Sequence, residues 1–516
     1  MHLRRLTVSM LGGLLLAAVL SGTARPQTAD VVWPTRQWPT STPEEQGMDS
    51  TALAKLVSYG ATRSLDSLLI ARHGRIVLDA YYAPYTPQIP HIINSATKAV
   101  TGTLIALALK DGLLDSLDHP MLDFFRDRTI ANVDDRKRAI TIQNMLDMTS
   151  GFAWTEGVEG GRPELLIEWA RSRDAINFVL DRPMANAPGD VFYYNTGNPQ
   201  LLSAIISKLT GLSARDYALA RLFRPLGIPA PYWHSVRPGL SQGGGGLLLV
   251  PRDAAKIGYL YLHDGEWEGQ RLLPPGWVDR IRNATLDMHA SFNPALRYAN
   301  YFWVLPDKNV FMAVGDRCQV IMVFPARDIV AVTTARDYCS FGKVAGDIAD
   351  AVKSDAALPA DPVGANLLAS ELRNVATEKP SAVGQAPPTA AAIAGKTYRF
   401  PSNALRVRAL ALSLTDQPAR YELEMSTSDP ANPVTKLTGP IGLDGLFRLG
   451  PSTPLGVMAL KGSWQDNRTF AIDMRMVGGD TDSRWLLSFD GGKASLRGKD
   501  RFGGDVQVDS DAAGGQ

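Results

Sequence analysis

The 516-residue sequence has few cysteines, no excess of charge of one sign and few long apolar runs. Lysine and arginine total 53 and aspartate and glutamate total 52, so the composition gives no indication of a nucleic-acid partner. Only two cysteines are present, and neither they nor the seven histidines show a metal-ligand spacing such as His-Glu-x-x-His. We therefore expect no metal and no cofactor. Cys318 and Cys339 flank a predicted hairpin and could pair in an oxidising compartment, while two separate thiols are equally compatible with the sequence.

The one pronounced apolar run that stands apart from a predicted helix or strand lies near the N-terminus. Arg4 and Arg5 precede it, it covers residues 11–20, and small residues follow at 21–24. This order is typical of a secretory signal over residues 1–24. The run is short for a membrane span, and no later stretch approaches one. We therefore expect a periplasmic or secreted protein without a transmembrane segment.

The remaining sequence divides by its pattern of apolar residues. Residues 25–356 go from strands to many helices and back to strands, which predicts an α+β domain with a helical cluster packed on an antiparallel sheet. Residues 357–392 are rich in proline and alanine and predict a linker, with one possible helix over 365–375. Residues 393–508 form short alternating segments separated by turns, typical of an all-β domain. The Gly- and Asp-rich residues 509–516 predict a disordered tail.

The strongest chemical signal is the sequence Ser95-Ala96-Thr97-Lys98 at the start of an apolar run. The run predicts a buried helix that ends at Gly112. Residues three apart on a helix share one face, so Ser95 and Lys98 are expected side by side. A lysine held against buried surface loses its charge more readily and can then accept the serine proton. Ser-x-x-Lys is a signature of serine acyl-transfer enzymes.

A second cluster, over residues 188–197, contains Tyr194. A nearby positive charge favours the phenolate of Tyr194, and a phenolate can pass a proton to a leaving group. The alternative is an aromatic loop that packs on the core. Four glycines over 243–246 either let the backbone pass close to another segment or form a flexible turn.

Together these motifs resemble the serine β-lactamase and penicillin-binding-protein superfamily. The chain is most similar in style to class C enzymes and their relatives, the esterases and 6-aminohexanoate-dimer hydrolases. Supporting features are Met148-Thr149-Ser150-Gly151, Gly245-Gly246-Leu247 and the helix that ends in Thr210-Gly211. The resemblance covers about residues 40–355 and implies a β-lactamase-like fold with the site between sheet and helices.

The resemblance also implies roles for individual residues. Ser95 would be the nucleophile, Lys98 its base, and Tyr194 the second base and acid. Relatives carry Asn two residues after the tyrosine, where this chain has Thr196. That departure favours the esterase and amide-hydrolase branches over antibiotic hydrolysis.

The third family motif is altered in this chain. Its best match is Gly315-Asp316-Arg317-Cys318-Gln319, in which Cys318 replaces a glycine of the relatives. The backbone N–H of Cys318 or Gln319, with that of Ser95, would form the oxyanion hole. Arg317 would substitute for the lost lysine or histidine in recognising the substrate.

Other serines and polar residues give weaker signals. Ser340 begins a second Ser-x-x-Lys without a partnered tyrosine cluster, and Ser241 lies in a Gly-x-Ser-x-Gly match within a loop. His91 and His234 could lie near the cleft, although such histidines are more often packing residues. The segment 154–156 either lines the cleft or packs in a loop.

The sequence therefore predicts an exported serine hydrolase that cleaves an ester or amide bond of a small-molecule or peptide-like substrate through an acyl-enzyme. The altered third motif leaves an alternative, a non-catalytic penicillin-binding-like sensor or binding protein. In a third hypothesis the C-terminal β domain packs over the cleft and limits substrate size. The sequence makes no prediction of oligomeric state.

Overall fold

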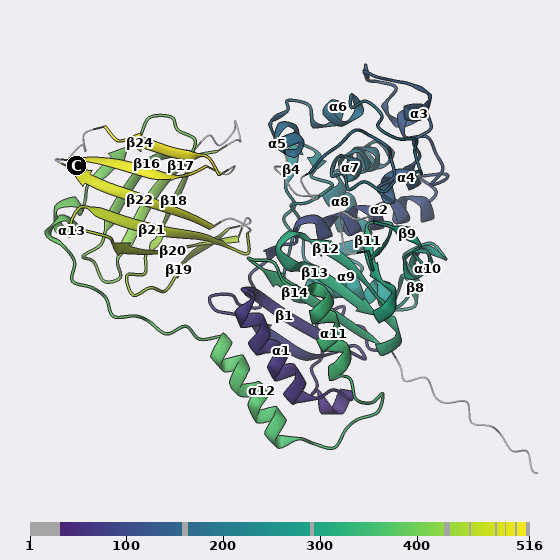
Figure 1. Cartoon of the computed structure of the whole chain (residues 1–516), viewed down its shortest axis with the longest axis horizontal. Helices are drawn as coiled ribbons and strands as arrows, with labels where there is room; N and C mark the ends of the chain where they lie inside the picture. The colour runs from purple at the N-terminus through teal and green to yellow at the C-terminus, as the bar shows by residue number, and fades with distance from the viewer. Residues whose placement is uncertain are drawn as a thin grey trace, which may run out of the picture.

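The computed structural model describes residues 31–156, 164–288, 294–427, 434–453, 456–479, 482–490, 492–500 and 503–511. The predicted signal over 1–24 lies outside these residues. A mixed helix-and-sheet domain is followed by an all-β domain (Figure 1), which confirms the predicted fold class. Among the described residues, no helix is both long and apolar enough to span a bilayer.

An eight-stranded antiparallel sheet forms the centre of the first domain, in the order β2-β1-β14-β13-β12-β11-β10-β9. Its strands are β1 (Leu65–Arg72), β2 (Arg75–Tyr81), β9 (Leu286–Asp287), β10 (Arg297–Ala299), β11 (Phe302–Leu305), β12 (Val310–Gly315), β13 (Gln319–Phe324) and β14 (Ile329–Ala335). β1 and β2 form a hairpin, with His73 and Gly74 at positive φ in its turn. The central strands are almost wholly buried, which explains why their sequences are continuous apolar runs instead of alternating ones.

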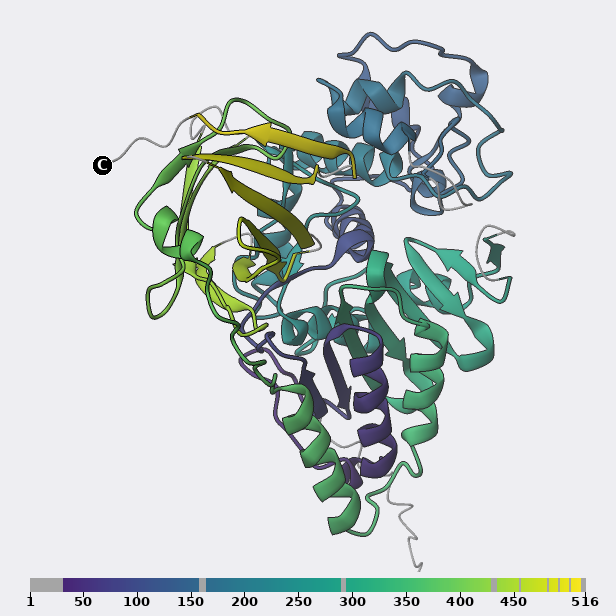
Figure 2. The ribbon, with the colours of Figure 1, turned by 60° about the vertical axis from the view of Figure 1, so that its left-hand side comes forward.

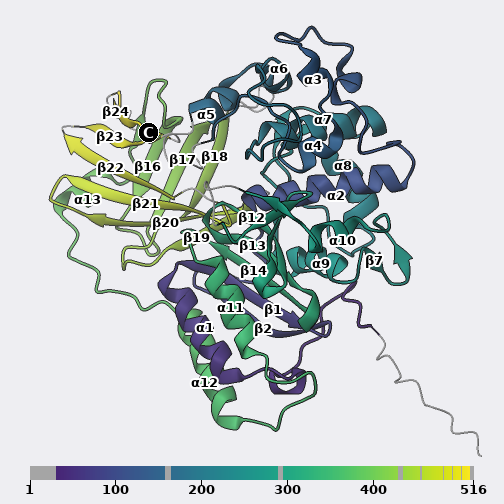
Figure 3. The ribbon, with the colours of Figure 1, turned by 45° about the vertical axis from the view of Figure 1, so that its right-hand side comes forward.

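Helices cover both faces of this sheet (Figure 3). α9 (Pro251–Leu262) lies on one face, where Gly258 packs against Val330 and Ile321. On the other face lie α1 (Ser50–Thr62) and α11 (Phe341–Ala351), and Phe341 of α11 contacts the ring of Trp303. Both faces therefore exclude water, and the sheet is a rigid support for the segments at its edges and ends.

The helical cluster lies at one side of the sheet. It contains α2 (Thr97–Lys110), α3 (Asp135–Arg138), α4 (Ile142–Leu146), α5 (Glu164–Arg171), α6 (Ala175–Leu180), α7 (Gly197–Thr210), α8 (Ala214–Ala218) and, beside the sheet, α10 (Trp277–Arg282). Every residue of α2 from Thr97 to Ala108 is buried, as its all-round apolar sequence predicts. α7 packs against α2 and ends at Gly211, whose φ of 71° is the left-handed conformation that glycine favours.

The segment predicted as a linker is only partly one. α12 (Pro362–Val375) packs against α1, and Ala83 N–H donates to the carbonyl of Val375 at 2.8 Å. Leu368 is buried in this contact. The helix expected over 365–375 is therefore present as α12, which Asp361 caps and which packs on the first domain instead of forming part of a free linker.

The C-terminal domain packs two antiparallel sheets around one core. The four-stranded sheet contains β15 (Thr397–Arg399), β16 (Val407–Ser413), β17 (Arg420–Ser426) and β18 (Val434–Pro440). The six-stranded sheet contains β19 (Arg448–Thr453), β20 (Gly456–Trp464), β21 (Thr469–Val477), β22 (Asp482–Asp490), β23 (Lys493–Lys499) and β24 (Asp505–Asp509). Strand β24 extends into the predicted disordered tail, and Ser510 is buried with its N–H donating to the carbonyl of Ala494. The tail prediction is therefore wrong for residues 509–511, and residues 512–516 lie outside the described ones.

The two domains touch one another (Figure 2), and the contact lies just before Ser95 in the sequence. The backbone N–H of Ile92 donates to the carbonyl of Gly478 at 2.6 Å. An apolar cluster joins the domains beside this bond, formed by Tyr85, Ile89, Val457, Ala459 and Val477. The β domain is thus docked on the chain segment that leads to Ser95.

Candidate active site

Ser95 and Lys98 lie together at the N-terminal end of the buried helix. Ser95 is in the short 3-10 turn η2 (Asn94–Ala96), which continues directly into α2. Lys98 follows one turn later, and its Nζ donates to Ser95 Oγ at 2.8 Å. The predicted pair is therefore within hydrogen-bonding distance on one helix face.

Burial changes the proton affinity of Lys98. The side chain is 2% exposed, and its Nζ also donates to the carbonyl of Gly244 at 2.9 Å. Loss of water lowers the pKa of Lys98 from 10.5 to about 8, while the carboxylate of Glu156 opposes this shift. A substantial fraction of Lys98 is therefore neutral under mildly alkaline conditions and able to accept a proton from Ser95.

The glycine run exists because this backbone passes close to α7 and α2. A Cβ on Gly243 would lie 1.9 Å from the carbonyl oxygen of Pro199, and one on Gly244 would lie 2.6 Å from Thr196 Cγ2. Thr101 Oγ1 donates to the carbonyl of Gly243 at 2.7 Å. Of the two interpretations of the glycine run, the structure shows the close approach of the backbone to another segment. This approach places the carbonyl of Gly244 at the ammonium of Lys98.

Tyr194 completes the predicted set. Its side chain is buried, its hydroxyl is hydrogen-bonded to Ser95, and Lys98 Nζ lies 4.9 Å from the centre of its ring. Burial raises the pKa of Tyr194, and the Glu156 carboxylate raises it further. The expectation of a phenolate is therefore wrong, because desolvation disfavours the charged form and Tyr194 stays a neutral hydroxyl.

Glu156 is a member of this site that the sequence indicated only as part of a possible cleft lining. Its Oε2 accepts a hydrogen bond from Thr196 Oγ1 at 2.8 Å, and its Oε1 accepts from Trp154 Nε1 at 2.7 Å and from the backbone N–H of Thr196. Thr196 is the N-cap of α7, where the helix dipole favours an anion. Thr196 thus holds a carboxylate at the position where relatives carry Asn, and 40 residues separate the two partners in sequence.

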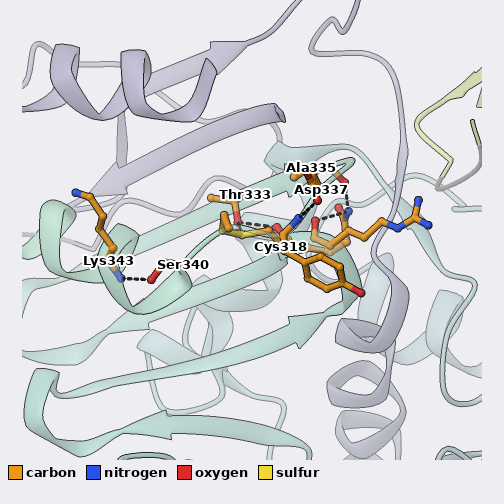
Figure 4. The surroundings of a disulfide bond; sticks show 10 residues. Cys318, Thr333, Ala335, Asp337, Ser340 and Lys343 are labelled. Carbon is orange, nitrogen blue, oxygen red and sulfur yellow. Dashed lines mark hydrogen bonds between the residues drawn. A yellow bond between two sulfur atoms is a disulfide. The ribbon is translucent and has the colours of Figure 1, made fainter. Parts of the chain in front are cut away.

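The third motif lies beside Ser95, at the end of β12. Gly315 permits this approach, because a Cβ there would lie 2.3 Å from the carbonyl oxygen of Ile93. Arg317 and Cys318 follow with φ values of 55° and 64°, in the left-handed region. Cys318 is joined to Cys339 by a disulfide whose Cα atoms are 5.6 Å apart (Figure 4). Of the two alternatives for these cysteines, the structure shows the pair.

The side chains of this motif have different surroundings. Gln319 Nε2 donates to the carbonyl of Ala335 at 2.5 Å, and the carbonyl of Cys318 accepts from Thr333 Oγ1 at 2.9 Å (Figure 4). Gln319 and Cys318 therefore face the protein interior with their side chains, which leaves their backbone N–H groups as the groups to consider for an oxyanion hole. The side chain of Arg317 is 40% exposed and lies 3.9 Å from Asp316.

The rival serines have structural roles. Ser340 caps α11 by accepting from the backbone N–H of Lys343, whose ammonium pairs with Asp347 at 2.6 Å. Ser241 is 1% exposed and accepts from the backbone N–H of Arg215 at 3.0 Å. Neither serine shares the arrangement found at Ser95.

The histidines singled out in the sequence lie close to the site. His91 is 2% exposed, stacks on Tyr85, and has a pKa that burial lowers to about 3. His234 lies against Gly246 and the ring of Tyr232. His91 is therefore a neutral packing residue of the interface between the domains.

Residues 53–353 match the family model described as Beta-lactamase. The chain belongs to the β-lactamase family. This membership places it among the β-lactamase-fold serine hydrolases. It is 22% identical over 284 residues to 6-aminohexanoate-dimer hydrolase of Paenarthrobacter ureafaciens, an alignment that covers 52% of this chain and 71% of that enzyme.

Two further proteins are similar to parts of this chain. The chain is 26% identical over 170 residues to the protein flp of Staphylococcus aureus (strain NCTC 8325 / PS 47), covering 31% of this chain and 33% of that protein. A solved structure of EstCE1, a hydrolase with promiscuous acyltransferase activity, superimposes with a TM-score of 0.49 and 18% identity over 59% of this chain and 99% of EstCE1.

Proposed function

We propose that the protein is an exported serine hydrolase that cleaves an ester or amide through an acyl-enzyme on Ser95. The observation that carries the proposal is the 2.8 Å hydrogen bond between Lys98 Nζ and Ser95 Oγ at a buried lysine whose pKa is lowered to about 8. The family relationship to a 6-aminohexanoate-dimer hydrolase supports hydrolysis over binding alone.

In the acylation step, neutral Lys98 accepts the hydroxyl proton of Ser95 while Oγ attacks the substrate carbonyl carbon. The carbonyl π bond opens to an oxyanion, which the backbone N–H groups of Ser95 and of Cys318 or Gln319 would stabilise. When the bond to the leaving group breaks, Tyr194 gives its hydroxyl proton to that group. The Lys98 ammonium then gives a proton to Tyr194, and Lys98 returns to its neutral form.

In the deacylation step, water attacks the acyl carbon and gives up a proton to the same two residues, Lys98 and Tyr194. Ser95 Oγ leaves with a proton, and the carboxylic acid product departs. Glu156 contributes a fixed negative charge that stabilises the ammonium form of Lys98 in both steps. Because Glu156 is held by Thr196 at the N-terminus of α7, its charge is fixed relative to Lys98 and Tyr194.

The altered third motif sets the substrate class. Asp316 and Arg317 stand beside Ser95 where relatives have a lysine or histidine, so the surroundings of the bound carbonyl differ from those in β-lactamases. We therefore assign an ester or linear amide as substrate, with Arg317 in contact with it. The predicted signal over residues 1–24 supports export to the periplasm or the medium.

The test compares two serines of the same local sequence pattern. A fluorophosphonate probe should label the parent protein and Ser340→Ala, and both should hydrolyse p-nitrophenyl acetate. Ser95→Ala should take up no probe and should lose about 10³-fold or more in kcat/KM. Equal hydrolysis by Ser95→Ala and the parent protein overturns the proposal.

The altered third motif also favours a second candidate, a penicillin-binding-like sensor that is acylated and not regenerated. The same experiment separates the two. Labelling of Ser95 by an ester or β-lactam that persists for hours without turnover supports the sensor, whereas steady release of p-nitrophenol excludes it.

A further inference from the structure

A cavity of about 1480 Å³ lies between the two domains, and the described residues that line it do not include Ser95, Lys98 or Tyr194. On the first domain its wall includes Ile92, Leu248, Arg317 and Tyr338. On the β domain its wall includes residues of β17, β20, β21, β22 and β23. The cavity therefore depends on both domains.

One end of this cavity adjoins the site. Ile92 is three residues before Ser95, and Arg317 follows Gly315, whose backbone packs against Ile93 and Ala96. Tyr338 shares a hydrogen bond with Asp316, and the Asp316 carboxylate is close enough to raise the pKa of Tyr194. The turn that contains Arg317 thus borders both the segment of Ser95 and the cavity.

Methionine distinguishes the wall that the β domain contributes. All four methionines after residue 393 line the cavity, namely Met425, Met458, Met474 and Met476. Met458 and Met476 are directly opposite one another on β20 and β21, and Met474 is on the same face of β21 as Met476. Leu405 and Trp485 extend this apolar surface, and charged side chains such as Arg406, Arg484 and Lys499 line other parts of the wall. Unbranched thioether side chains adapt their shape to flexible apolar ligands, and a concentration of them on one surface is typical of such binding sites.

We propose that this cavity binds the acyl chain of the substrate, and that this chain is flexible, apolar and several methylenes long. The inference rests on the proposed acyl-enzyme function of Ser95. The acyl portion is favoured over the leaving group because, among the described residues that line the cavity, Arg317 belongs to the proposed oxyanion turn. Tyr194, the proposed proton donor to the leaving group, is not part of that lining.

The first test is a chain-length series of p-nitrophenyl esters from acetate to dodecanoate. In the parent enzyme kcat/KM should rise about threefold for each added methylene until the cavity is filled. Met476→Trp fills part of the cavity and should lower kcat/KM for the dodecanoate by about tenfold or more, with less than about a twofold change for the acetate. Gln465→Trp is the matched control, because it adds the same indole at the exposed hairpin at the other end of β20 and β21.

A second variant and the melting temperature show whether Met476→Trp loses activity because it unfolds or because the indole fills the cavity. Met474→Trp should repeat the selective loss of the dodecanoate, and both variants should melt within a few degrees of Gln465→Trp. The inference is overturned if folded Met476→Trp and Met474→Trp retain parent activity on the dodecanoate. It is also overturned if they lose acetate and dodecanoate activity equally.

A binding measurement distinguishes failure of the inference from failure of the proposed function. Dodecanoate is titrated calorimetrically into Ser95→Ala and into Ser95→Ala/Met476→Trp. Binding to the first and loss of binding to the second support the cavity assignment even if no ester is hydrolysed. Ser95-dependent hydrolysis without dodecanoate binding leaves the proposed function standing and overturns the acyl-chain site.

Discussion

The backbone N–H of Ile92 donates a hydrogen bond to the carbonyl of Gly478, and this contact ties the C-terminal β domain to the segment that carries Ser95. Gly478 has a φ of 88°, and a Cβ there would lie 2.0 Å from the carbonyl oxygen of Pro90. Only glycine allows both the left-handed backbone and the close approach. Replacement of Gly478 therefore has a clear structural consequence for the contact between the domains.

Gly478→Ala should separate the domains at this contact. Gly492→Ala is the matched control, because Gly492 has a similar φ of 100° and no atom within 4 Å of the position of its Cβ. Both variants incur backbone strain, and only Gly478→Ala collides with the first domain. We expect faster proteolytic cleavage between residues 377 and 387 and a larger radius of gyration in Gly478→Ala alone. Identical behaviour of the two variants contradicts the assigned role of this contact.

The pH dependence of the reaction should report Lys98. Burial lowers its pKa to about 8, and only the neutral amine can accept the Ser95 proton. The value of kcat/KM should therefore rise about tenfold per pH unit below this pKa and level off above it. Lys98→Met should reduce kcat/KM by about 10³-fold or more. A profile that is flat between about pH 6 and pH 9 contradicts the assignment of Lys98 as base.

The sequence predicts those features of the fold and site that depend on residues close together in the chain and on the chemistry of single side chains. Ser95 and Lys98 share a helix face because three residues separate them, and Thr141 caps α4 because the capping pattern is local. Strands β18, β19, β23 and β24 were not predicted individually, because each contains only one or two apolar residues besides glycine and proline. The composition of residues 357–392 resembles a linker, and only the packed structure shows that α12 lies against α1.

The features that the sequence did not predict depend on contacts between residues that are far apart in the chain. Glu156 meets Thr196 only when α7 and the loop after Gly151 come together. The pKa of Tyr194 depends on burial, which neighbouring sequence does not specify, and so its direction was predicted wrongly. The exposed or buried orientation of Arg317 and Gln319 follows from two left-handed residues in one turn, where the relatives' glycine has been replaced.

The glycines over 243–246 should differ in how well they tolerate replacement by alanine. Gly243→Ala places a methyl group 1.9 Å from the backbone oxygen of Pro199, so the loop must move, and we expect a loss of about 1–3 kcal/mol of unfolding free energy. Gly245→Ala is the control, because its nearest neighbour, Gln242 Nε2, lies 3.5 Å away at ordinary contact distance. Urea unfolding at constant pH measures the unfolding free energy of both variants. Since Lys98 bonds to Gly244, Gly243→Ala should also lower kcat, and equal effects of the two variants contradict the packing explanation.

The disulfide should stabilise the third-motif turn. Cys318 and Cys339 are 21 residues apart, and a loop of this size is stabilised by about 3 kcal/mol through restriction of the unfolded chain. Dithiothreitol should lower the unfolding free energy of the parent protein by this amount, and its kcat/KM should fall because the turn beside Ser95 loosens. Cys318→Ala/Cys339→Ala should match the reduced protein and show no response to dithiothreitol. A parent protein that gives the same urea midpoint with and without reductant contradicts the prediction.

Glu156→Gln should move the pH profile without removing the nucleophile. The Glu156 carboxylate raises the pKa of Lys98 against the larger effect of burial, so its neutralisation should lower that pKa further. Neutral lysine then exists at lower pH, and the rise in kcat/KM should shift toward acid by about half a pH unit to one unit. Thr196→Val is the matched variant, because it removes the hydroxyl that donates to Glu156 Oε2 and keeps the carboxylate. If Glu156 acts through its charge, Thr196→Val leaves the midpoint of the profile near that of the parent while lowering kcat. Equal midpoints in all three proteins would mean that Glu156 is a structural acceptor only, since loss of a hydrogen bond alone changes rates without changing the protonation of Lys98.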